Sequence, residues 1–251
     1  MTESTWQVRI VDDRTTLARG AAEIVAAAAE SAVAARGTFS LVLSGGSTPR
    51  ELYRLLADER EPYRARVAWE RVHLWWGDER HVPPDHEESN FRMAREVLLA
   101  HAPPVPIPAA NVHRIRAEDP DAARAAAEYD ALLAPLASPR FDLVLLGLGA
   151  DCHTASLFPG TEALAERRRL AVSVWVEKLS THRITLTVPA LSDAAQVLFL
   201  VAGEDKAAAL ARVLDGDEPP ESCPARAVVP AVGELIWLVA RDAAFLMHGK
   251  H

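Results

Sequence analysis

Cysteine and lysine are both scarce in this sequence of 251 residues. Its two cysteines, Cys152 and Cys223, stand far apart and belong to no metal-binding or redox motif. This usage excludes a disulfide framework and a cysteine zinc site, and it is typical of a reducing compartment. Only three of the 27 basic residues are lysines, at positions 178, 206 and 250. In a chain that otherwise uses arginine, each lysine is therefore a candidate for a specific role.

The sequence also lacks the usual features of a secreted or membrane protein. Residues 1–6 contain no basic segment followed by an apolar core, so we expect no signal peptide. The alanine-rich run over residues 21–35 contains Glu23 and Glu30, which indicates a helix rather than a membrane span. A formal net charge of −8 argues against nucleic acid or an anionic membrane as the main partner. We therefore expect a cytoplasmic protein, a monomer or weak homodimer, whose pocket must be locally positive if its substrate is an anion.

Apolar runs alternate with segments of helical periodicity along most of the chain. Hydrophobic residues make up 49% of the sequence and charged residues 25%, as in globular proteins. Strands are predicted at residues 7–11, 39–43, 72–76, 111–115, 141–146, 171–176, 183–188, 197–202 and 235–240. Helices are predicted at residues 15–36, 90–99, 121–136 and 205–214, with another that begins at residue 49. This alternation predicts an α/β fold: a Rossmann-like open, mostly parallel sheet with helices on both faces, in a single large domain over residues 1–251.

Residues 141–160, FDLVLLGLGADCHTASLFPG, combine a strand with a titratable turn. The first six residues are typical of a strand that is buried on both faces. Gly147 and Gly149 then let the backbone turn sharply and approach a ligand. Asp151 and His153 follow at the carboxyl end of the strand, where open α/β sheets bind ligands. His153 is a candidate catalytic residue, because imidazole titrates at about pH 6.5 and can accept a proton from water at neutral pH.

A second glycine-containing loop follows the predicted strand at residues 39–43. The loop consists of Ser44, Gly45, Gly46, Ser47 and Thr48. We expect Thr48 to be the N-cap of the next helix, with Pro49 in its first position and Glu51 completing a capping box. Several backbone N–H groups and the helix dipole would then point to one place, which favours an anion such as phosphate. A plain strand-to-helix turn is the alternative, and the loop is not the G-x-G-x-x-G dinucleotide fingerprint.

Charged residues also follow the predicted strand at residues 72–76. Asp78, Glu79 and Arg80 come directly after it, and Ser89 is expected to cap the helix at residues 90–99. Taken alone, these residues fit either a surface salt-bridge cluster or a binding site.

Together, these loops resemble those of the 6-phosphogluconolactonases, the enzymes of the second step of the pentose phosphate pathway. The matching segments are LSGGSTP at 43–49, WGDERHVP at 76–83 with Ser89-Asn90 after it, NVHRI at 111–115, GLGADCHTASLFPG at 147–160, RITLT at 183–187 and GEDK at 203–206. They follow the family's order over nearly the whole chain. The most specific part of the match is GDER-x-VP followed by HTASLFP.

The resemblance implies hydrolysis of 6-phospho-D-glucono-1,5-lactone to 6-phospho-D-gluconate, without a metal or an organic cofactor. A lactone is an internal ester, so the reaction needs an activated water, stabilisation of an oxyanion and a site for the phosphate. His153 is the expected general base. The resemblance places Arg183 and Lys206 near the phosphate, together with the loop at residues 44–48.

The remaining candidate residues have alternative roles. Arg80 is expected to bind either the phosphate or the developing oxyanion. Asp78 and Asp151 are expected to hold sugar hydroxyls or to orient His153, as an aspartate does in other histidine-dependent sites. The other histidines of this region show no metal-ligand spacing, and we interpret them as surface or local structure. They are His73, His81, His86 and His182.

Two other functions compete with the lactonase. A glucosamine-6-phosphate deaminase/isomerase has a related fold, but such enzymes resemble one another through D-E-Y after the third strand. Here Arg80 follows Asp78 and Glu79, and TASLFP follows the histidine, both of which favour the lactonase. A non-catalytic sugar-phosphate sensor would normally carry a DNA-binding segment, and no helix-turn-helix fits before the first strand.

The sequence departs from the family pattern in two places. Cys152 replaces the usual glycine before the catalytic histidine. If that position requires positive φ, the side chain costs about 1 kcal/mol and shifts His153. The segment at residues 178–183 lacks the prolines that are common in the family. Neither change removes a group that performs chemistry.

Overall fold

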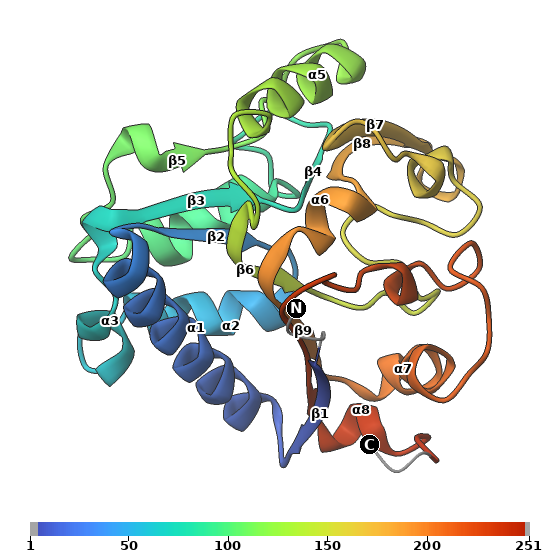
Figure 1. Ribbon diagram of the computed structural model, residues 1–251, viewed down its shortest axis with the longest axis horizontal. Coiled ribbons are helices and arrows are strands. Elements are labelled where there is room, and N and C mark those ends of the chain that lie inside the picture. The colour runs from blue at the N-terminus through green and yellow to red at the C-terminus, as the bar shows by residue number, and fades with distance from the viewer. Residues whose placement is uncertain (1–4, 249–251) are drawn as a thin grey trace.

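Two β-sheets and their surrounding helices make up the computed structural model of this chain, which describes residues 5–248 (Figure 1). Residues 1–4, in the segment that we expect to lack a signal peptide, and Lys250 lie outside the described residues. Within residues 5–248, no helix combines the length and apolar character that a membrane crossing requires.

The larger sheet has seven strands, and every neighbouring pair in it is parallel. In spatial order the strands are β1 (Thr5–Val11), β10 (Glu234–Ala240), β9 (Ala194–Val201), β6 (Phe141–Leu146), β2 (Phe39–Leu43), β3 (Val72–Trp76) and β5 (Val112–His113). The predicted open, mostly parallel sheet is thus confirmed. The central strands β2 and β6 are apolar because helices and loops cover both of their faces.

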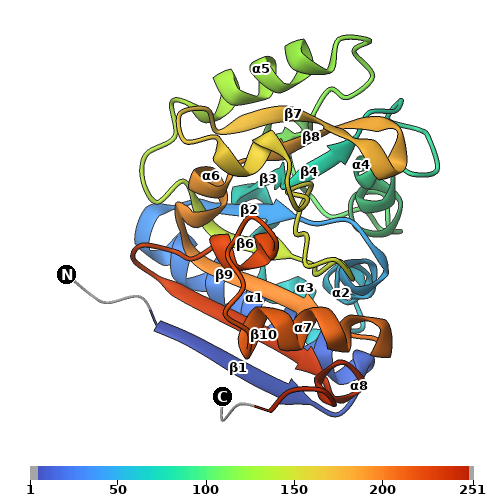
Figure 2. The same ribbon diagram turned by 90° about the vertical axis from the view of Figure 1, so that its right-hand side faces the viewer.

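The smaller sheet is antiparallel, and the sequence did not predict it as a separate unit. Its strands are β4 (Asp78–Arg80), β8 (Thr181–Leu186) and β7 (Ala171–Val176). Strand β4 leaves the end of β3 after Gly77, and it covers the charged residues for which we had predicted no strand. Figure 2 shows this sheet above the larger one, beneath helix α5 (Ala122–Leu133).

The connections of β2 and β6 run in opposite directions along the larger sheet. The chain proceeds from β2 to β3 and β5, whereas from β6 it proceeds to β9 and β10. These two adjacent strands therefore form the topological switch point, and a crevice opens beyond their carboxyl ends. The loops that follow them, at residues 44–46 and 147–156, are the two that we had selected from the sequence.

Helices cover both faces of the larger sheet, and Figure 2 shows α1 and α7 on opposite sides of β9 and β10. The other α-helices are α1 (Arg14–Arg36), α2 (Ser47–Ala57), α3 (Pro62–Arg66), α4 (Asn90–Ala94), α6 (Val188–Ser192), α7 (Ala207–Leu214) and α8 (Arg241–Ala244). Short 3₁₀ turns are η1 (Trp69–Arg71), η3 (Ala109–Asn111), η4 (Glu162–Ala165), η5 (Glu177–Leu179), η6 (Glu204–Lys206) and η7 (Pro224–Ala227). A π-helical turn, η2 (Arg95–Leu99), extends α4.

Helix α1 begins at Arg14, one residue before its predicted start, and it ends at Arg36 as predicted. The Asp13 side chain accepts a hydrogen bond from Thr16 N at 2.7 Å, which caps the first turn. Gly37 ends the helix at φ 79, and its N–H donates to Val33 O at 2.8 Å. The face between them is largely alanine, which lets the helix lie close to the sheet.

Helix α2 begins two residues earlier than we predicted, and the expected capping box is wrong. Gly46 occupies the N-cap position at φ 106, a conformation that glycine adopts without steric cost. Thr48 therefore lies inside the helix rather than at its cap. The Glu51 carboxylate accepts a hydrogen bond from the Thr15 hydroxyl at 3.4 Å instead of returning to the helix terminus.

Other boundaries differ by a few residues. The predicted helix at 90–99 is divided between α4 and η2, although Ser89 does cap it by accepting from Arg92 N at 3.1 Å. The predicted helix at 121–136 ends at Leu133. Strand β5 is shorter than predicted but lies at an edge of the sheet, as expected.

Candidate active site

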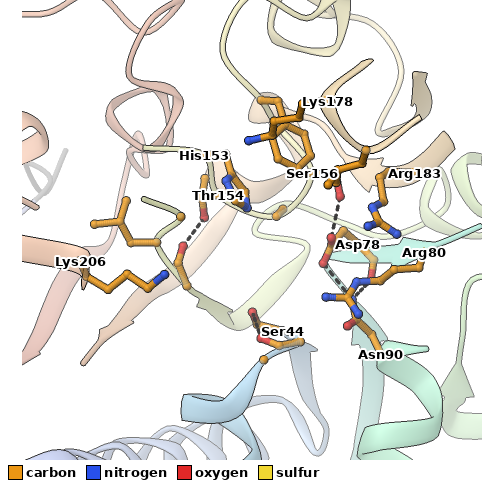
Figure 3. Close-up of a pocket in the computed structure, with 18 residues that line it drawn as sticks. Ser44, Asp78, Arg80, Asn90, His153, Thr154, Ser156, Lys178, Arg183 and Lys206 are labelled. Atoms are coloured by element: carbon orange, nitrogen blue, oxygen red, sulfur yellow. Dashed lines mark hydrogen bonds between the residues drawn. The ribbon is translucent and has the colours of Figure 1, made fainter. Parts of the chain in front are cut away.

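A cavity of about 420 Å³ lies beyond the carboxyl ends of β2 and β6. The smaller sheet closes one side of it, through β4 and β8. Of the residues selected from the sequence, those that line the cavity are Ser44, Gly45, Gly46, Asp78, Arg80, Gly147, Gly149, His153, Lys178, Arg183 and Lys206. Figure 3 shows His153 near the middle, with Lys206 on one side and Arg80 and Arg183 on the other.

The glycine loop after β2 is held close to helix α4. A Cβ atom at Gly45 would lie 1.9 Å from Oδ1 of Asn90, so only glycine fits there. The Tyr53 hydroxyl donates to Ser44 O at 2.8 Å and accepts from Ser44 N at 2.9 Å. The Ser44 N–H is therefore already paired, and Gly45 and Gly46 provide the backbone that faces the cavity.

Ser47 and Thr48, which we expected to bind phosphate, are not among the residues that line the cavity. Their hydroxyl oxygens accept hydrogen bonds from Nη2 of Arg14, at 2.9 and 3.1 Å. Arg14 is the first residue of α1, and it ties that helix to the start of α2. No local pattern indicated this arginine, because it lies 33 positions before Ser47 in the sequence.

His153 lies in a tight turn after β6 and pairs with Asp151. Its Nδ1 lies 2.5 Å from Oδ1 of Asp151, and its ring stacks on Phe158 with centroids 4.2 Å apart. A Cβ atom at Gly149 would lie 1.9 Å from Nδ1, so glycine is needed for the ring to occupy this position. Cys152 adopts φ 67, the positive value that we considered for this position. Within the described residues, Nε2 of His153 has no hydrogen-bond partner.

Asp151 is held in its charged form. Partial burial alone would raise the pKa of its carboxyl, but hydrogen bonds from His153 and Lys178 outweigh that effect and lower the pKa. Lys178 forms an ion pair with Oδ2 of Asp151, and it also lines the cavity. The scarcity of lysine made Lys178 notable, but its sequence position did not connect it with Asp151.

Asp78 belongs to a buried hydrogen-bond network rather than to the histidine pair. Its Oδ2 accepts from the Ser156 hydroxyl at 2.7 Å, and its Oδ1 accepts from Nδ2 of Asn90 at 3.1 Å. Glu79 accepts from the backbone N–H groups of Asn90 and Phe91, and burial raises the pKa of its carboxyl. These contacts hold β4 against α4 and so fix one wall of the cavity. Of the two candidate aspartates, Asp151 is therefore the one that contacts His153.

Arg80 and Arg183 face one another across the antiparallel pair β4–β8. Burial, with a further contribution from Arg80, lowers the pKa of the Arg183 guanidinium. Arg183 has no hydrogen-bond or ion-pair partner within residues 5–248, whereas Arg80 donates to the backbone oxygen of Glu88. Two adjacent guanidinium groups that form no ion pair within the described residues are suited to bind an anion.

Lys206 approaches the cavity from η6, at the carboxyl end of β9. Gly203 begins this turn at φ 108, and its N–H donates to Oδ1 of Asp242 at 3.0 Å. The Lys206 amine pairs with Oδ2 of Asp205 at 2.9 Å, but that carboxylate is exposed and leaves the lysine able to contact a ligand. The cavity thus has positive charge on two sides of His153.

The histidines outside the cavity have local partners. Nδ1 of His73 lies 3.1 Å from Nε2 of His113, and Nε2 of His81 lies 2.6 Å from the Asp119 carbonyl oxygen. The ring of His182 packs edge-on against Trp175. In the part of the chain that the structure describes, no three histidine, cysteine or acidic side chains are grouped as metal ligands.

The fold and the cavity define a class of α/β proteins that bind a small anion at the switch point of a parallel sheet. The family described as glucosamine-6-phosphate isomerases/6-phosphogluconolactonase matches residues 12–237. The chain therefore belongs to this family.

Known relatives are similar to this chain over nearly its whole length. A 6-phosphogluconolactonase from Nostoc sp. is 41% identical over 243 residues, which cover 94% of this chain and 95% of the relative. The crystal structure of 6-phosphogluconolactonase from Thermotoga maritima is 29% identical, with a TM-score of 0.80 and coverage of 94% and 100%. A monomeric glucosamine-6-phosphate deaminase has a TM-score of 0.81 at 21% identity, which shows a shared fold alone.

Proposed function

We propose that this protein hydrolyses 6-phospho-D-glucono-1,5-lactone to 6-phospho-D-gluconate, with His153 as the general base. The observation that carries the proposal is the His153–Asp151 pair in a cavity with cationic groups on two sides. Asp151 accepts from Nδ1 and so directs the lone pair of Nε2 toward the cavity. Support also comes from the curated relatives, which are named 6-phosphogluconolactonases.

The proposed reaction has two steps. Nε2 of His153 accepts a proton from water while the water oxygen attacks the lactone carbonyl carbon, which gives a tetrahedral oxyanion. The ring C–O bond then breaks, and the imidazolium returns the proton to the departing ring oxygen. Asp151 remains ionised throughout and stabilises the transient imidazolium. The carboxylic acid that forms then ionises in solution.

The cationic groups are proposed to bind the phosphate and the developing oxyanion. Arg183, Lys206 and the backbone of the glycine loop are proposed to bind the phosphate. Arg80 is proposed to contact either that phosphate or the developing oxyanion, which forms on the carbonyl oxygen. Asp78 accepts from Ser156 and Asn90 and is proposed to orient this wall and the sugar hydroxyls next to it.

Acid release from freshly generated 6-phosphogluconolactone, corrected for spontaneous hydrolysis, tests the proposed activity. Ammonia release from glucosamine 6-phosphate is measured beside it. Catalysed acid release without ammonia is the expected result. Ammonia release would favour a deaminase, and binding of either compound without turnover would favour a sugar-phosphate sensor.

Replacement of the proposed base tests the mechanism. We expect His153→Ala to lower turnover by at least about 100-fold, the scale of a lost general base, with folding retained. His86→Ala provides the control, because His86 is an exposed histidine outside the cavity and should leave turnover unchanged. Turnover near the native value in His153→Ala would remove this residue from the mechanism.

A further inference from the structure

Lys178 contacts both of the side chains that hold His153. Its amine forms an ion pair with Oδ2 of Asp151 and lies 4.6 Å from the centroid of the Phe158 ring. Asp151 uses its other oxygen for Nδ1 of His153, and the Phe158 ring stacks on the imidazole. One lysine thus links the hydrogen-bonding and the stacking partners of the same ring.

The position of Lys178 depends on the smaller sheet. It lies in the 3₁₀ turn η5 between β7 and β8, and Ser180 closes this turn at φ 48. Figure 3 shows the Lys178 side chain beside His153 in the cavity. The turn after β6 carries Asp151, His153 and Phe158, so Lys178 connects the smaller sheet with the side chains that hold the histidine.

We propose that Lys178 is a positioning residue, which fixes Asp151 and Phe158 around His153 and balances the charge of Asp151. The inference rests on the proposed role of His153 as the base. A carboxylate beside Nδ1 orients the ring, but it also favours the protonated imidazolium, which has no lone pair for water. The Lys178 ammonium opposes protonation of the imidazole, and it leaves the orientation of the ring unchanged.

Charged groups from the histidine's own turn and from four other elements surround His153 and determine this balance. Asp151 belongs to the same turn, and Lys178 comes from η5. The other charged residues of the cavity are Lys206 from η6, Arg183 from β8, and Asp78 and Arg80 from β4. Of these cations, Lys178 alone pairs with Asp151 within the described residues, so removing its charge changes the histidine pair most directly.

The pH dependence of kcat and kcat/KM distinguishes positioning from a general loss of structure. Lys178→Met removes the charge and keeps an apolar side chain against Phe158, and Lys178→Gln removes the charge with a polar side chain. We expect both variants to lower kcat about tenfold. We also expect the acidic limb of the pH–rate profile to move to higher pH by about 0.5 to 1 pH unit. Lys178→Arg retains the charge and should keep kcat and the acidic limb near their native values.

Lys206→Met is the matched control, because it removes the same charge from the same cavity but has no contact with Asp151. It should raise KM and move the acidic limb less than Lys178→Met does. If Lys178→Met instead raises KM and leaves the limb unmoved, Lys178 contacts the substrate and the proposal is wrong. Native kinetics in both neutral variants would also overturn it.

An NMR titration separates this inference from the proposed function. The imidazole signals of His153, assigned by their loss in His153→Gln, are followed against pH in the native protein and in Lys178→Met. A titration displaced to higher pH in the variant supports the positioning role even if the native protein lacks lactonase activity. Superimposed titrations would overturn the role whatever the enzyme assay gives.

Discussion

Cys152 retains a side chain at a backbone position that favours glycine. Its φ of 67 costs of order 1 kcal/mol for a residue with a Cβ atom. The side chain is fully buried, and its Sγ lies 3.6 Å from the carbonyl oxygen of Ala209. Burial raises the pKa of the thiol, which therefore remains protonated and acts as a small apolar group. The strain and the gain from burial are of similar size, so they offset one another.

The substitution Cys152→Gly should leave the unfolding free energy within about 1 kcal/mol of the native value, because relief of the strain offsets the lost burial. Turnover should be at least that of the native protein. Cys152→Ala is the control, since it loses the thiol but keeps the strained φ; urea unfolding should find it about 1 kcal/mol less stable than the glycine variant. A large loss of turnover in Cys152→Gly, or equal stability of the two variants, would contradict this account.

At the scale of secondary-structure elements, strands β4 and β8 place like charges opposite one another. Arg80 and Arg183 are register partners, an arrangement that destabilises an antiparallel pair. An anion bound between the two guanidinium groups would reduce their repulsion, so the same arrangement favours anion binding. Under the proposed function, this position loses stability in favour of ligand binding, as is common at functional sites.

Substituting the proposed phosphate ligands tests this interpretation. We expect Arg183→Gln to raise KM at least about tenfold for the phosphorylated lactone and much less for gluconolactone, since charge-assisted hydrogen bonds are lost. Lys206→Gln should behave in the same way. Thermal unfolding without ligand should find Arg183→Gln no less stable than the native protein. Equal effects on both substrates would show that the substituted residue does not hold the phosphate.

The elements that the sequence predicted well are those whose signal is local. Strands β2 and β6 are continuous apolar runs, and Gly37 ends α1 in the conformation that glycine favours. Strand β4 was missed because its residues, Asp-Glu-Arg, are polar and pair with a strand about a hundred positions away. The start of α2 was misplaced because Gly46 reaches the N-cap conformation that we had assigned to a threonine.

The residues of the candidate site were likewise predictable where their signal is local. His153 and the glycine loop could be identified because each lies directly after a strand, at the edge where ligands bind. The roles of Asn90, Ser156 and Lys178 depend on contacts between elements that are distant in the sequence, and no pattern within one segment reveals them. Asp78 was found, but its partners could not be inferred.

At the scale of the whole molecule, the global and local charges have opposite signs. The chain has a formal net charge of −8, but the cavity contains Arg80, Arg183, Lys178 and Lys206. A distant anion therefore meets a repulsive field, while an anion inside the cavity lies within a few ångströms of several cations. Because Coulomb energy falls with distance, the local cations should dominate the energy of the bound state.

Ionic strength tests which charge governs substrate binding. Salt shortens the Debye length from about 30 Å at 0.01 M to about 10 Å at 0.1 M, and it weakens the attraction of the partly exposed cavity cations. We expect KM for the phosphorylated lactone to rise several-fold between about 0.01 and 0.5 M sodium chloride, with kcat nearly constant. Gluconolactone, which has no charge, is the matched control and should show little change in KM. Sodium chloride is preferred to phosphate or sulfate, because those anions would compete for the same guanidinium groups. A fall in KM for the phosphorylated lactone would mean that the overall negative charge, rather than the cavity, controls its capture.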